Sequence, residues 1–528
     1  MTNYKFPIEL CGTEFYNKSS LVIHKHLDDA FRKCNNYILN NGINKYLNIV
    51  SVFYPLIARL LINYTFIKFE IEVANVLTLR QAKKLMLSKE KSVWPINYQN
   101  VLSGKYGPNG YEYLNVSPTS FRIKSKLFIK NCFKAISNLM SDIFEDSNSP
   151  LILKSPNAKF NTKNLAKNHG LRSKDIDLYT KIFIPEMENQ KIILFSEIHI
   201  MEQELGKLFS SKFEFDKAFL SFFNMEISTY CSNSYPKEIN ANIILLGSLA
   251  DLKCRIFAAI GKSQNVPIIS VWHGENIGDK DEPVSGPIGQ TYCDVILGYG
   301  EYGCEKIKKG IYNKSLFEQP LIVPSSSSVL KEIFKDNKVK KIYKTKDLTI
   351  MYVPTSFSGT NRDGPFRDLH DIAYCLWQQN MLNSVLKIIN PKQLIRKRHK
   401  KENGEFNFKV NKIKQLHKSD LLDVMDETEV FIFDYPTTAF AYAAATNKPI
   451  IYFDIGLRNL MPDALESIKD RCIYVKGNVE DVESMVNIIL KNIHKKCVNT
   501  YTDKYSVSND SRSRKDILLD TIKEYAIS

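Results

Sequence analysis

At 528 residues, with 44% hydrophobic and 24% charged residues, the chain is too long for one core and has the composition of a globular protein with two domains and a tail. The 72 Lys and Arg residues against 57 Asp and Glu give a formal net charge of +15, which suits phosphorylated ligands, nucleic acid or an anionic membrane surface. The ten cysteines form no C-x-x-C pair, which indicates reduced thiols in a cytosolic protein.

The first 180 residues mix helical patterns with polar loops and carry no readable chemical motif. The N-terminal sequence MTNYKFPIELCG lacks the basic and then apolar pattern of a signal peptide. The most apolar stretch, Leu47–Ile67, contains Pro55 and Arg59. We therefore expect a buried helix at this stretch and not one that spans a membrane or lies on its surface.

From about residue 190, short apolar runs alternate with helical segments. Strands are predicted at 191–199, 239–248, 266–272 and 293–300, and helices at 249–264 and after residue 300. Continuous β-branched runs separated by helices are typical of a parallel, doubly wound sheet. The Ser-, Pro- and Lys-rich segment 320–347 is predicted to connect two domains.

A second α/β series follows this connection. Strands are predicted at 348–356 and 392–400, a helix at 366–389, and the order helix, strand, loop, helix, strand over 419–454. An amphipathic helix ends the chain after a Ser/Asn/Asp capping region. We expect an α/β fold with two doubly wound, Rossmann-like domains that face a central cleft. Their predicted bounds are 1–325, with largely helical additions over 1–180, and 345–490, followed by a tail helix within 491–528.

Ligands of such sheets bind beyond the carboxyl ends of the strands, so the loops at those ends are where chemistry is expected. The sequence SVWHGENIGD (270–279) places His273, Gly274 and Glu275 directly after a strand. A histidine here can act as a general base because its ordinary pKa lies near neutrality, and glycine allows a close approach. The alternative is a loop histidine that bonds a backbone carbonyl. The H-x-E of zinc deaminases lacks its P-C-x-x-C partner here, so we predict no metal site.

Three further loops have residue types that bind phosphate. They are the basic run 396–401, the Ser/Thr/Gly loop 353–364, and the turn before the alanine-rich helix at 439–445. Arginine can hold phosphate through two hydrogen bonds, and hydroxyls with free N–H groups at a helix N-terminus make an anion site. A solvated charge run, a flexible loop and a plain N-cap are the ordinary alternatives. The candidate donor-binding residues are Thr355, Ser356, Arg396, Arg398, His399, Asp434, Thr437 and Thr438.

The sequence GYGEYG (298–303) matches the dinucleotide-binding pattern G-x-G-x-x-G after a strand. No acidic residue ends a clear strand about 20 residues further on, and Glu318 is followed by Pro320. We therefore do not expect a dinucleotide here.

Taken together, the loops resemble those of bacterial GT-B glycosyltransferases of surface-polysaccharide assembly, near the CDP-glycerol glycerophosphotransferases and the capsule and lipopolysaccharide Kdo transferases. VPIISVWHGE is similar to their strand followed by His-Gly. LIRKRH is similar to their strand with a basic end, with Lys400 where they often have Pro. VFIFDYPTTAFAYAAATNKPIIYFD is similar to their Asp-Tyr-Ser-Ser, helix, Lys-Pro and strand, with two threonines at the small-residue pair. The likeness spans roughly residues 240 to 460.

The resemblance implies that the C-terminal domain holds a nucleotide donor, with Arg396 and His399 on its phosphates and the two threonines at the helix N-terminus. The N-terminal domain would take the acceptor and supply His273 as base, with Glu275 orienting it or binding the acceptor. No cofactor or metal is expected, because a helix dipole and basic side chains can stabilise the departing phosphate. The motifs imply a cytidine-linked donor, such as a CMP-ulosonic acid of the Kdo or sialic-acid type.

Other functions stay open from the residues. One is transfer of a polyol phosphate from CDP-glycerol or CDP-ribitol, which makes a phosphodiester instead of a glycoside. A non-catalytic relative and a nucleic-acid-binding protein are others, although the basic residues are dispersed and do not form the stripe that nucleic acid needs. A retaining mechanism would need a carboxylate nucleophile, for which Glu275 or Glu197 are candidates. We expect a glycan or lipid-linked acceptor, no nucleic acid, and a cytoplasmic protein that can lie on the anionic inner membrane surface.

Overall fold

The computed structural model of the chain describes residues 13–72, 150–155, 171–175, 181–209, 212–233, 239–272, 274, 276–281, 285–309, 315–336, 348–355, 371–387, 390, 393–398, 410, 413–416, 421–476 and 498–527. Four of the candidate site residues lie outside this part of the chain: His273, Glu275, Ser356 and His399.

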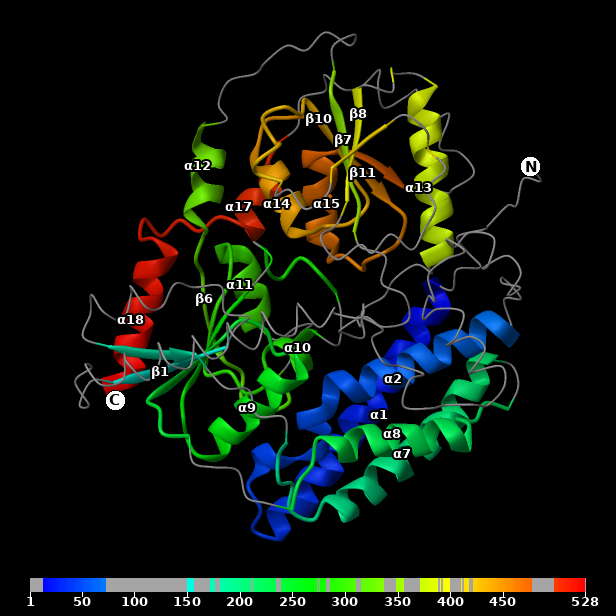
Figure 1. Cartoon of the computed structure of the whole chain (residues 1–528), viewed down its shortest axis with the longest axis vertical. Helices are drawn as coiled ribbons and strands as arrows, with labels where there is room; N and C mark the ends of the chain where they lie inside the picture. Colours follow the sequence, from blue (N-terminus) through cyan, green and yellow to red (C-terminus); the bar gives the residue numbers. More distant parts are fainter. Residues whose placement is uncertain are drawn as a thin grey trace, which may run out of the picture.

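Two parallel sheets lie one above the other along the long axis of the molecule (Figure 1). The first has the strand order β2-β1-β3-β4-β5-β6. Its strands are β1 (Leu151–Lys154), β2 (Arg172–Asp175), β3 (Ile243–Leu246), β4 (Ile268–Val271), β5 (Val295–Leu297) and β6 (Leu321–Val323). The predicted strands over 239–248, 266–272 and 293–300 are confirmed. The segment 320–347 is not only a connection, because it begins with β6 and continues into α12 (Ser328–Asp336).

Alternate residues of the first sheet are buried on opposite faces. Ile243 and Leu245 of β3 face the C-terminal helix α18 (Arg514–Ile527), while Ile244 and Leu246 face the core shared with α9 (Leu252–Ser263). Successive residues of a strand point to opposite faces of the sheet, and helices cover both faces of this one. The residues of such a strand are therefore mostly apolar, which explains the continuous apolar runs in the sequence.

A helical part packs against the first sheet, at the lower right of Figure 1. It consists of α1 (Thr13–Asn40), the short 3-10 helix η2 (Lys45–Leu47), α2 (Ile49–Glu72), α7 (Met187–Phe209) and α8 (Lys217–Thr229). The α1 and α7 helices run antiparallel, since Lys25 pairs with Glu204 while Tyr37 donates to Glu186. Within the described helices, one segment, Lys45–Ile62, is long and apolar enough to cross a membrane, but 78% of it is buried in the fold. The predicted buried helix is thus confirmed.

The predicted strand at 191–199 is wrong, because these residues belong to α7. Buried positions recur with helical spacing at Gln190, Leu194, Glu197, Met201 and Leu205. Two of these positions are polar, so the apolar residues alone do not show the helical spacing. The short apolar run 192–195 therefore indicated a strand.

The second sheet has the order β12-β11-β10-β7-β8-β9. Its strands are β7 (Ile350–Val353), β8 (Leu394–Lys397), β9 (Lys414–Leu416), β10 (Val430–Phe433), β11 (Ile450–Asp454) and β12 (Ile473–Lys476). Counted from β7, this is the doubly wound Rossmann order, in which the strand order reverses between the parallel strands β7 and β10. The predicted strands over 348–356 and 392–400 are confirmed, but turns replace the helix that was expected just before β10. These two parallel sheets with their helices confirm the predicted fold class, an α/β fold of GT-B type with two domains.

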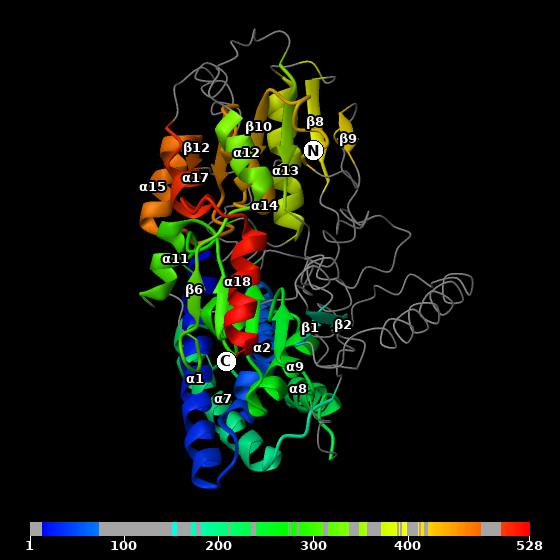
Figure 2. The ribbon, with the colours of Figure 1, turned by 90° about the vertical axis from the view of Figure 1, so that its left-hand side faces the viewer.

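Helices cover both faces of the second sheet. One face packs on α13 (Asp371–Leu386), and the other on α14 (Thr438–Ala445), α15 (Pro462–Arg471) and α17 (Thr500–Tyr505). The chain then returns to the first domain, where α18 packs against the first sheet. Figure 2 shows this path, with α17 beside the upper sheet and α18 along the lower one. The helices α10 (Ser285–Gly289) and α11 (Glu301–Lys308) complete the first domain.

Candidate functional site

The reversal point of the second sheet brings two predicted loops together. Phe433 at the end of β10 is paired with Val353 at the end of β7, so Thr355 and Asp434 follow two adjacent strands at the same edge. Open parallel sheets bind ligands just outside the carboxyl ends of the strands where the strand order reverses. The predicted donor loops therefore occupy the position at which this sheet can bind a ligand.

The helix α14 begins at this edge. Thr437 is its N-cap, with an extended backbone and a side-chain oxygen that accepts a hydrogen bond from the N–H of Phe440 at 3.3 Å. Thr438 is the first helical residue. The first N–H groups of a helix have no partner within the helix, and the helix dipole favours a negative charge there. This arrangement suits a phosphate.

Asp434 lies beneath the two loops and joins them. Its Oδ2 atom accepts hydrogen bonds from the hydroxyls of Tyr352, at 2.5 Å, and Tyr374, at 2.8 Å. The Tyr374 hydroxyl also accepts the backbone N–H of Thr355 at 3.0 Å. Burial raises the pKa of Asp434 to about 7, against the lowering effect of the two hydroxyls and of Arg396. The carboxyl group is buried, so its position supports the loops from below instead of offering a surface contact.

Arg396 also lies inside the second domain. Its side chain is fully buried within β8, and Nε and Nη2 both donate to the Gln378 side-chain oxygen, at 3.2 and 2.9 Å. The resemblance implied that this guanidinium contacts the donor phosphates, but in the structure it lies beneath the surface. Arg398 follows the strand end and is half-buried, which puts it nearer to the loop surface.

Gly274 brings the first domain to this edge. It has φ of +115°, which suits glycine, and a Cβ atom there would lie 3.9 Å from the Thr438 hydroxyl oxygen. The loop that contains the predicted base therefore reaches the N-terminus of α14 from the opposite sheet. Trp272, which directly follows β4, accepts a hydrogen bond at its carbonyl oxygen from Arg514 of α18 at 2.9 Å. Parallel strands, a helix N-terminus and a loop from the other domain thus converge.

The glycines of GYGEYG serve packing between protein segments. A Cβ atom on Gly300 would lie 2.5 Å from the carbonyl oxygen of Lys504, and one on Gly298 would lie 2.7 Å from the sulfur of Cys304. A Cβ atom on Gly303 would overlap the carbonyl oxygen of Ile277. These three glycines are therefore explained by the close approach of protein segments to one another.

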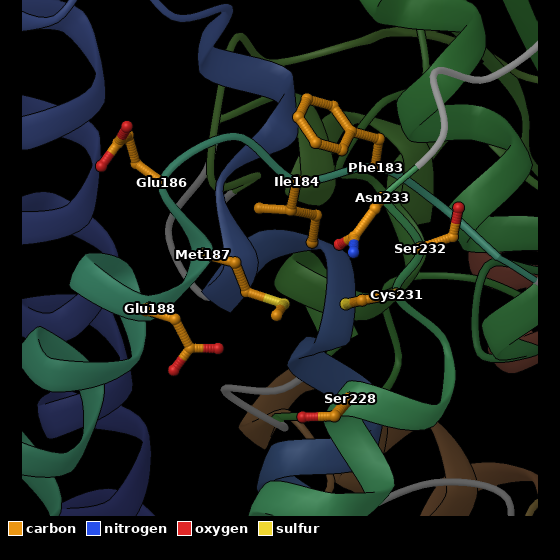
Figure 3. A pocket seen from close by; sticks show the side chains of 9 residues that line it. All are labelled: Phe183, Ile184, Glu186, Met187, Glu188, Ser228, Cys231, Ser232 and Asn233. Carbon is orange, nitrogen blue, oxygen red and sulfur yellow. The ribbon is translucent and has the colours of Figure 1, made fainter.

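A separate cavity of 440 Å³ lies in the helical part, between the start of α7 and the end of α8. In Figure 3 the side chains of Ile184, Met187, Cys231 and Asn233 converge on it, while Glu186 points away. Phe183, Glu188, Ser228 and Ser232 complete the lining. Burial raises the pKa of Cys231 to about 11, so this thiol is protonated and unreactive at neutral pH. The cavity contributes nothing to the site between the sheets.

Glu197 lies in the same helical part and not at a strand end. Its carboxylate pairs with His26, at 3.3 Å, and with Lys33. Asp29, His26 and Glu197 could bring one ligand atom each within 4.8 Å of one another. The ammonium of Lys33 already neutralises Glu197, and Arg32 pairs with Asp29, so the cluster is explained as an ion-pair network between α1 and α7. Its position leaves Glu197 remote from the loops of the site.

No family model and no curated protein matches the chain. Solved structures do. The chain is similar to UDP-GlcNAc 2-epimerase from Neisseria meningitidis, with 10% identity and a TM-score of 0.38 over 71% of this chain and 100% of that one. It is similar to the wall teichoic acid polymerase TagF, with 13% identity and a TM-score of 0.35 over 78% and 98%. It is also similar to MurG of Acinetobacter baumannii, with 7% identity and a TM-score of 0.32 over 71% and 99%.

Proposed function

We propose that the chain is a glycosyltransferase of bacterial surface-polysaccharide synthesis, which transfers a sugar from a nucleotide-activated donor to a glycan or lipid-linked acceptor. One observation carries the proposal: the two candidate donor loops flank the reversal point of the second sheet, and the Gly274 loop of the first domain meets them at Thr438. A donor held by the second domain would then face the residues that follow β4. Donor on one side and acceptor on the other is the arrangement that direct group transfer needs.

Each group of residues in the site is proposed to have its own role. The N–H groups and hydroxyls at the start of α14 bind the donor phosphates and stabilise the charge that develops on the leaving group. Arg398 adds positive charge from the end of the neighbouring strand β8, and His399, the next residue in the sequence, is proposed to contact the donor phosphates. The buried Asp434 joins the two loops through Tyr352 and Tyr374, and the buried Arg396 lies close enough to favour its charged form. With helix dipole and basic side chains in these roles, the reaction needs no resident metal or cofactor.

His273 is the proposed general base, which takes the proton of the acceptor hydroxyl as the bond to the donor sugar forms. The nucleotide leaves with the electron pair of the bond that breaks. The donor is proposed to be cytidine-linked, a CMP-ulosonic acid, because the motif over 430–454 is similar to that of transferases with such donors. A CDP-polyol phosphotransferase is the second candidate, and the mass of the product separates a new glycoside from a new phosphodiester.

Nucleotide binding tests the donor site. Calorimetry with CMP, CDP and UDP is expected to show binding, with a preference for a cytidine nucleotide. Thr438→Val removes one hydroxyl without changing the shape, and a lost hydrogen bond to a charged group is worth about 1.5–3 kcal/mol, so affinity should fall at least about tenfold. Thr500 is the first residue of α17, as Thr438 is of α14, so Thr500→Val is the matched control and should leave affinity unchanged. Equal affinities in all three proteins would remove the nucleotide from this helix.

Turnover tests the base. His273→Ala is expected to lower turnover by about 10²–10⁴-fold, the usual contribution of a general base, while donor affinity stays nearly unchanged. Glu275→Gln should have a smaller effect if Glu275 only orients the base. Near-normal turnover of His273→Ala would assign the chemistry to another residue.

A further inference from the structure

The loop after Gly274 is fastened to the second domain and the tail by three buried polar side chains. Asn276 donates through its side-chain nitrogen to Asp279 Oδ2 and to the Tyr501 hydroxyl, both at 2.8 Å, and Tyr501 donates to the same Asp279 oxygen at 2.8 Å. Their exposed fractions are 4%, 1% and 0%. We call these three residues the junction triad. It links β4's loop with α17, 222 residues further along the chain.

The charge of the junction triad is balanced. The Asp279 carboxylate also pairs with Lys280, whose Nζ lies 3.1 Å from Oδ1. Burial, with Asp279 beside it, raises the pKa of Tyr501 well above its ordinary value, so the hydroxyl keeps its proton and remains a donor. A buried carboxylate with a full set of donors holds its partners in fixed directions, because any displacement leaves a buried charge without compensation.

Backbone contacts fix the same loop. Met461 donates its N–H to the Asp279 carbonyl, and Asp281 donates to the Asn459 carbonyl, both at 3.0 Å. Lys280 and Leu460 form an antiparallel bridge between these bonds. Residues 279–281 of the loop after β4 are therefore held by backbone hydrogen bonds to residues 459–461 of the second domain.

The junction triad also touches the proposed site. Asn276 uses its side-chain nitrogen in the triad, while its Oδ1 atom would lie 3.5 Å from a Cβ atom on Gly274. Gly274 in turn lies beside Thr438. The position of the loop over the start of α14 is thus set by side chains that are themselves held from the second domain and the tail.

We propose that Asn276, Asp279 and Tyr501 are positioning residues, which hold the loop after β4 so that Gly274 stays beside the N-terminus of α14. The proposal rests on the proposed function for its catalytic consequence. Its structural part, that the triad orders this loop, stands without it. Reacting groups on two domains need a fixed mutual position, since a misplacement of about 1 Å can lower the rate about 10²-fold.

Hydrogen exchange of the loop and steady-state kinetics, measured on the full chain, test the proposal. Tyr501→Phe removes one hydroxyl and leaves Asp279 with Asn276 and Lys280. We expect exchange in peptides over 272–281 to become at least about tenfold faster, kcat to fall at least about tenfold, and the donor Kd to stay within about twofold. The matched control is Tyr505→Phe, one turn on in α17 and in the same core, whose hydroxyl lies outside the junction triad. It should change none of the three.

The outcomes separate the two proposals. If the unmodified chain turns over no nucleotide donor but Tyr501→Phe still loosens the loop, the proposed function fails and the positioning role stands. If exchange over 272–281 is unchanged in Tyr501→Phe, or equally faster in Tyr505→Phe, the positioning role is overturned. Unfolding of Tyr501→Phe at the assay temperature would also overturn it, in favour of general stability. Asn276→Ala, which keeps the bond between Tyr501 and Asp279, should reproduce the fall in kcat with little change in donor Kd.

Discussion

A carboxyl group without water around it titrates differently from one at the surface, and Asp434 shows the effect. Burial raises its pKa to about 7 although two tyrosine hydroxyls and Arg396 favour the charged form. Removal of water is the dominant cause because a buried charge has lost its hydration. The Asp434 carboxyl, which accepts the hydroxyls of Tyr352 and Tyr374, therefore has a pKa close to neutral pH.

The pH dependence of stability follows with a definite sign. The pKa of Asp434 is higher in the folded chain than its ordinary value of 3.8, so the folded state binds the proton more tightly and the stabilising contribution falls as pH rises from about 4 to about 7. Within that window each pH unit is worth up to about 1.4 kcal/mol. Asp434→Asn cannot ionise, and its unfolding free energy, measured by urea denaturation, should fall less steeply from pH 5 to pH 7.5. Parallel curves for the two proteins would contradict the assignment.

Two glycines with similar backbone angles allow conformational strain to be separated from steric overlap. Gly42 has φ of +68° with nothing within 4 Å of an added Cβ, whereas at Gly278, with φ of +78°, the Cβ would overlap the Gly303 carbonyl. Alanine at Gly42 should lower the unfolding free energy by about 1–2 kcal/mol through its backbone angle alone. At Gly278 overpacking should add about 1–3 kcal/mol. Equal denaturation midpoints of the two variants would show that the loop at Gly278 can move away.

Some of the site could be predicted from single residues, and some could not. The placement of Thr355, Asp434 and Thr437 at one edge of the second sheet could be predicted, because they come after strands and parallel strands end at one edge. The burial of Arg396 was not predictable, because a basic residue at a strand end is usually exposed and its buried partner, Gln378, lies on a separate helix. Nothing in the sequence pointed to Tyr501, since it lies more than 220 residues from its partners in the junction triad.

At the scale of elements, the start of α14 depends on its cap. The Thr437 side chain satisfies the Phe440 N–H, which would otherwise lack a partner within the helix. Thr437→Ala should lower the unfolding free energy by about 0.5–2 kcal/mol, the usual value of an N-cap. Thr437→Ser keeps the oxygen and should restore most of the loss. If serine and alanine are equally destabilising in thermal denaturation, the methyl group and not the cap stabilises this turn.

Some strands and helices could be predicted from their sequences and others could not. Strands β3, β4, β5, β7 and β10 were predicted because each is a short apolar run that is buried on both faces. The edge strand β2, with the sequence RSKD, has no such run, because an edge strand needs little apolar cover. The helix α7 was mistaken for a strand because its buried positions include Gln190 and Glu197, whose partners lie on other helices.

For the whole molecule, the net charge of +15 predicts weak binding to anionic membranes. Co-sedimentation with vesicles that contain acidic lipids should be clear at low salt. It should be lost near 1 M salt, where the screening length falls to about 3 Å. Neutral phosphatidylcholine vesicles are the control and should not bind the chain. Sedimentation that is the same at low and high salt would indicate insertion of apolar side chains in place of electrostatic attraction.

The return of the chain to its first domain sets an order on its synthesis. Strand β6 ends at Val323, and α18, which covers one face of the same sheet, begins only at Arg514, about 190 residues later. At 5–20 residues per second, the ribosome needs roughly 10–40 s to make that interval. Throughout it, Ile243, Leu245, Ile269 and Val295 lack their final cover. The first domain therefore cannot complete its core by itself as it leaves the ribosome, and this apolar face is where a chaperone would be expected to hold the nascent chain.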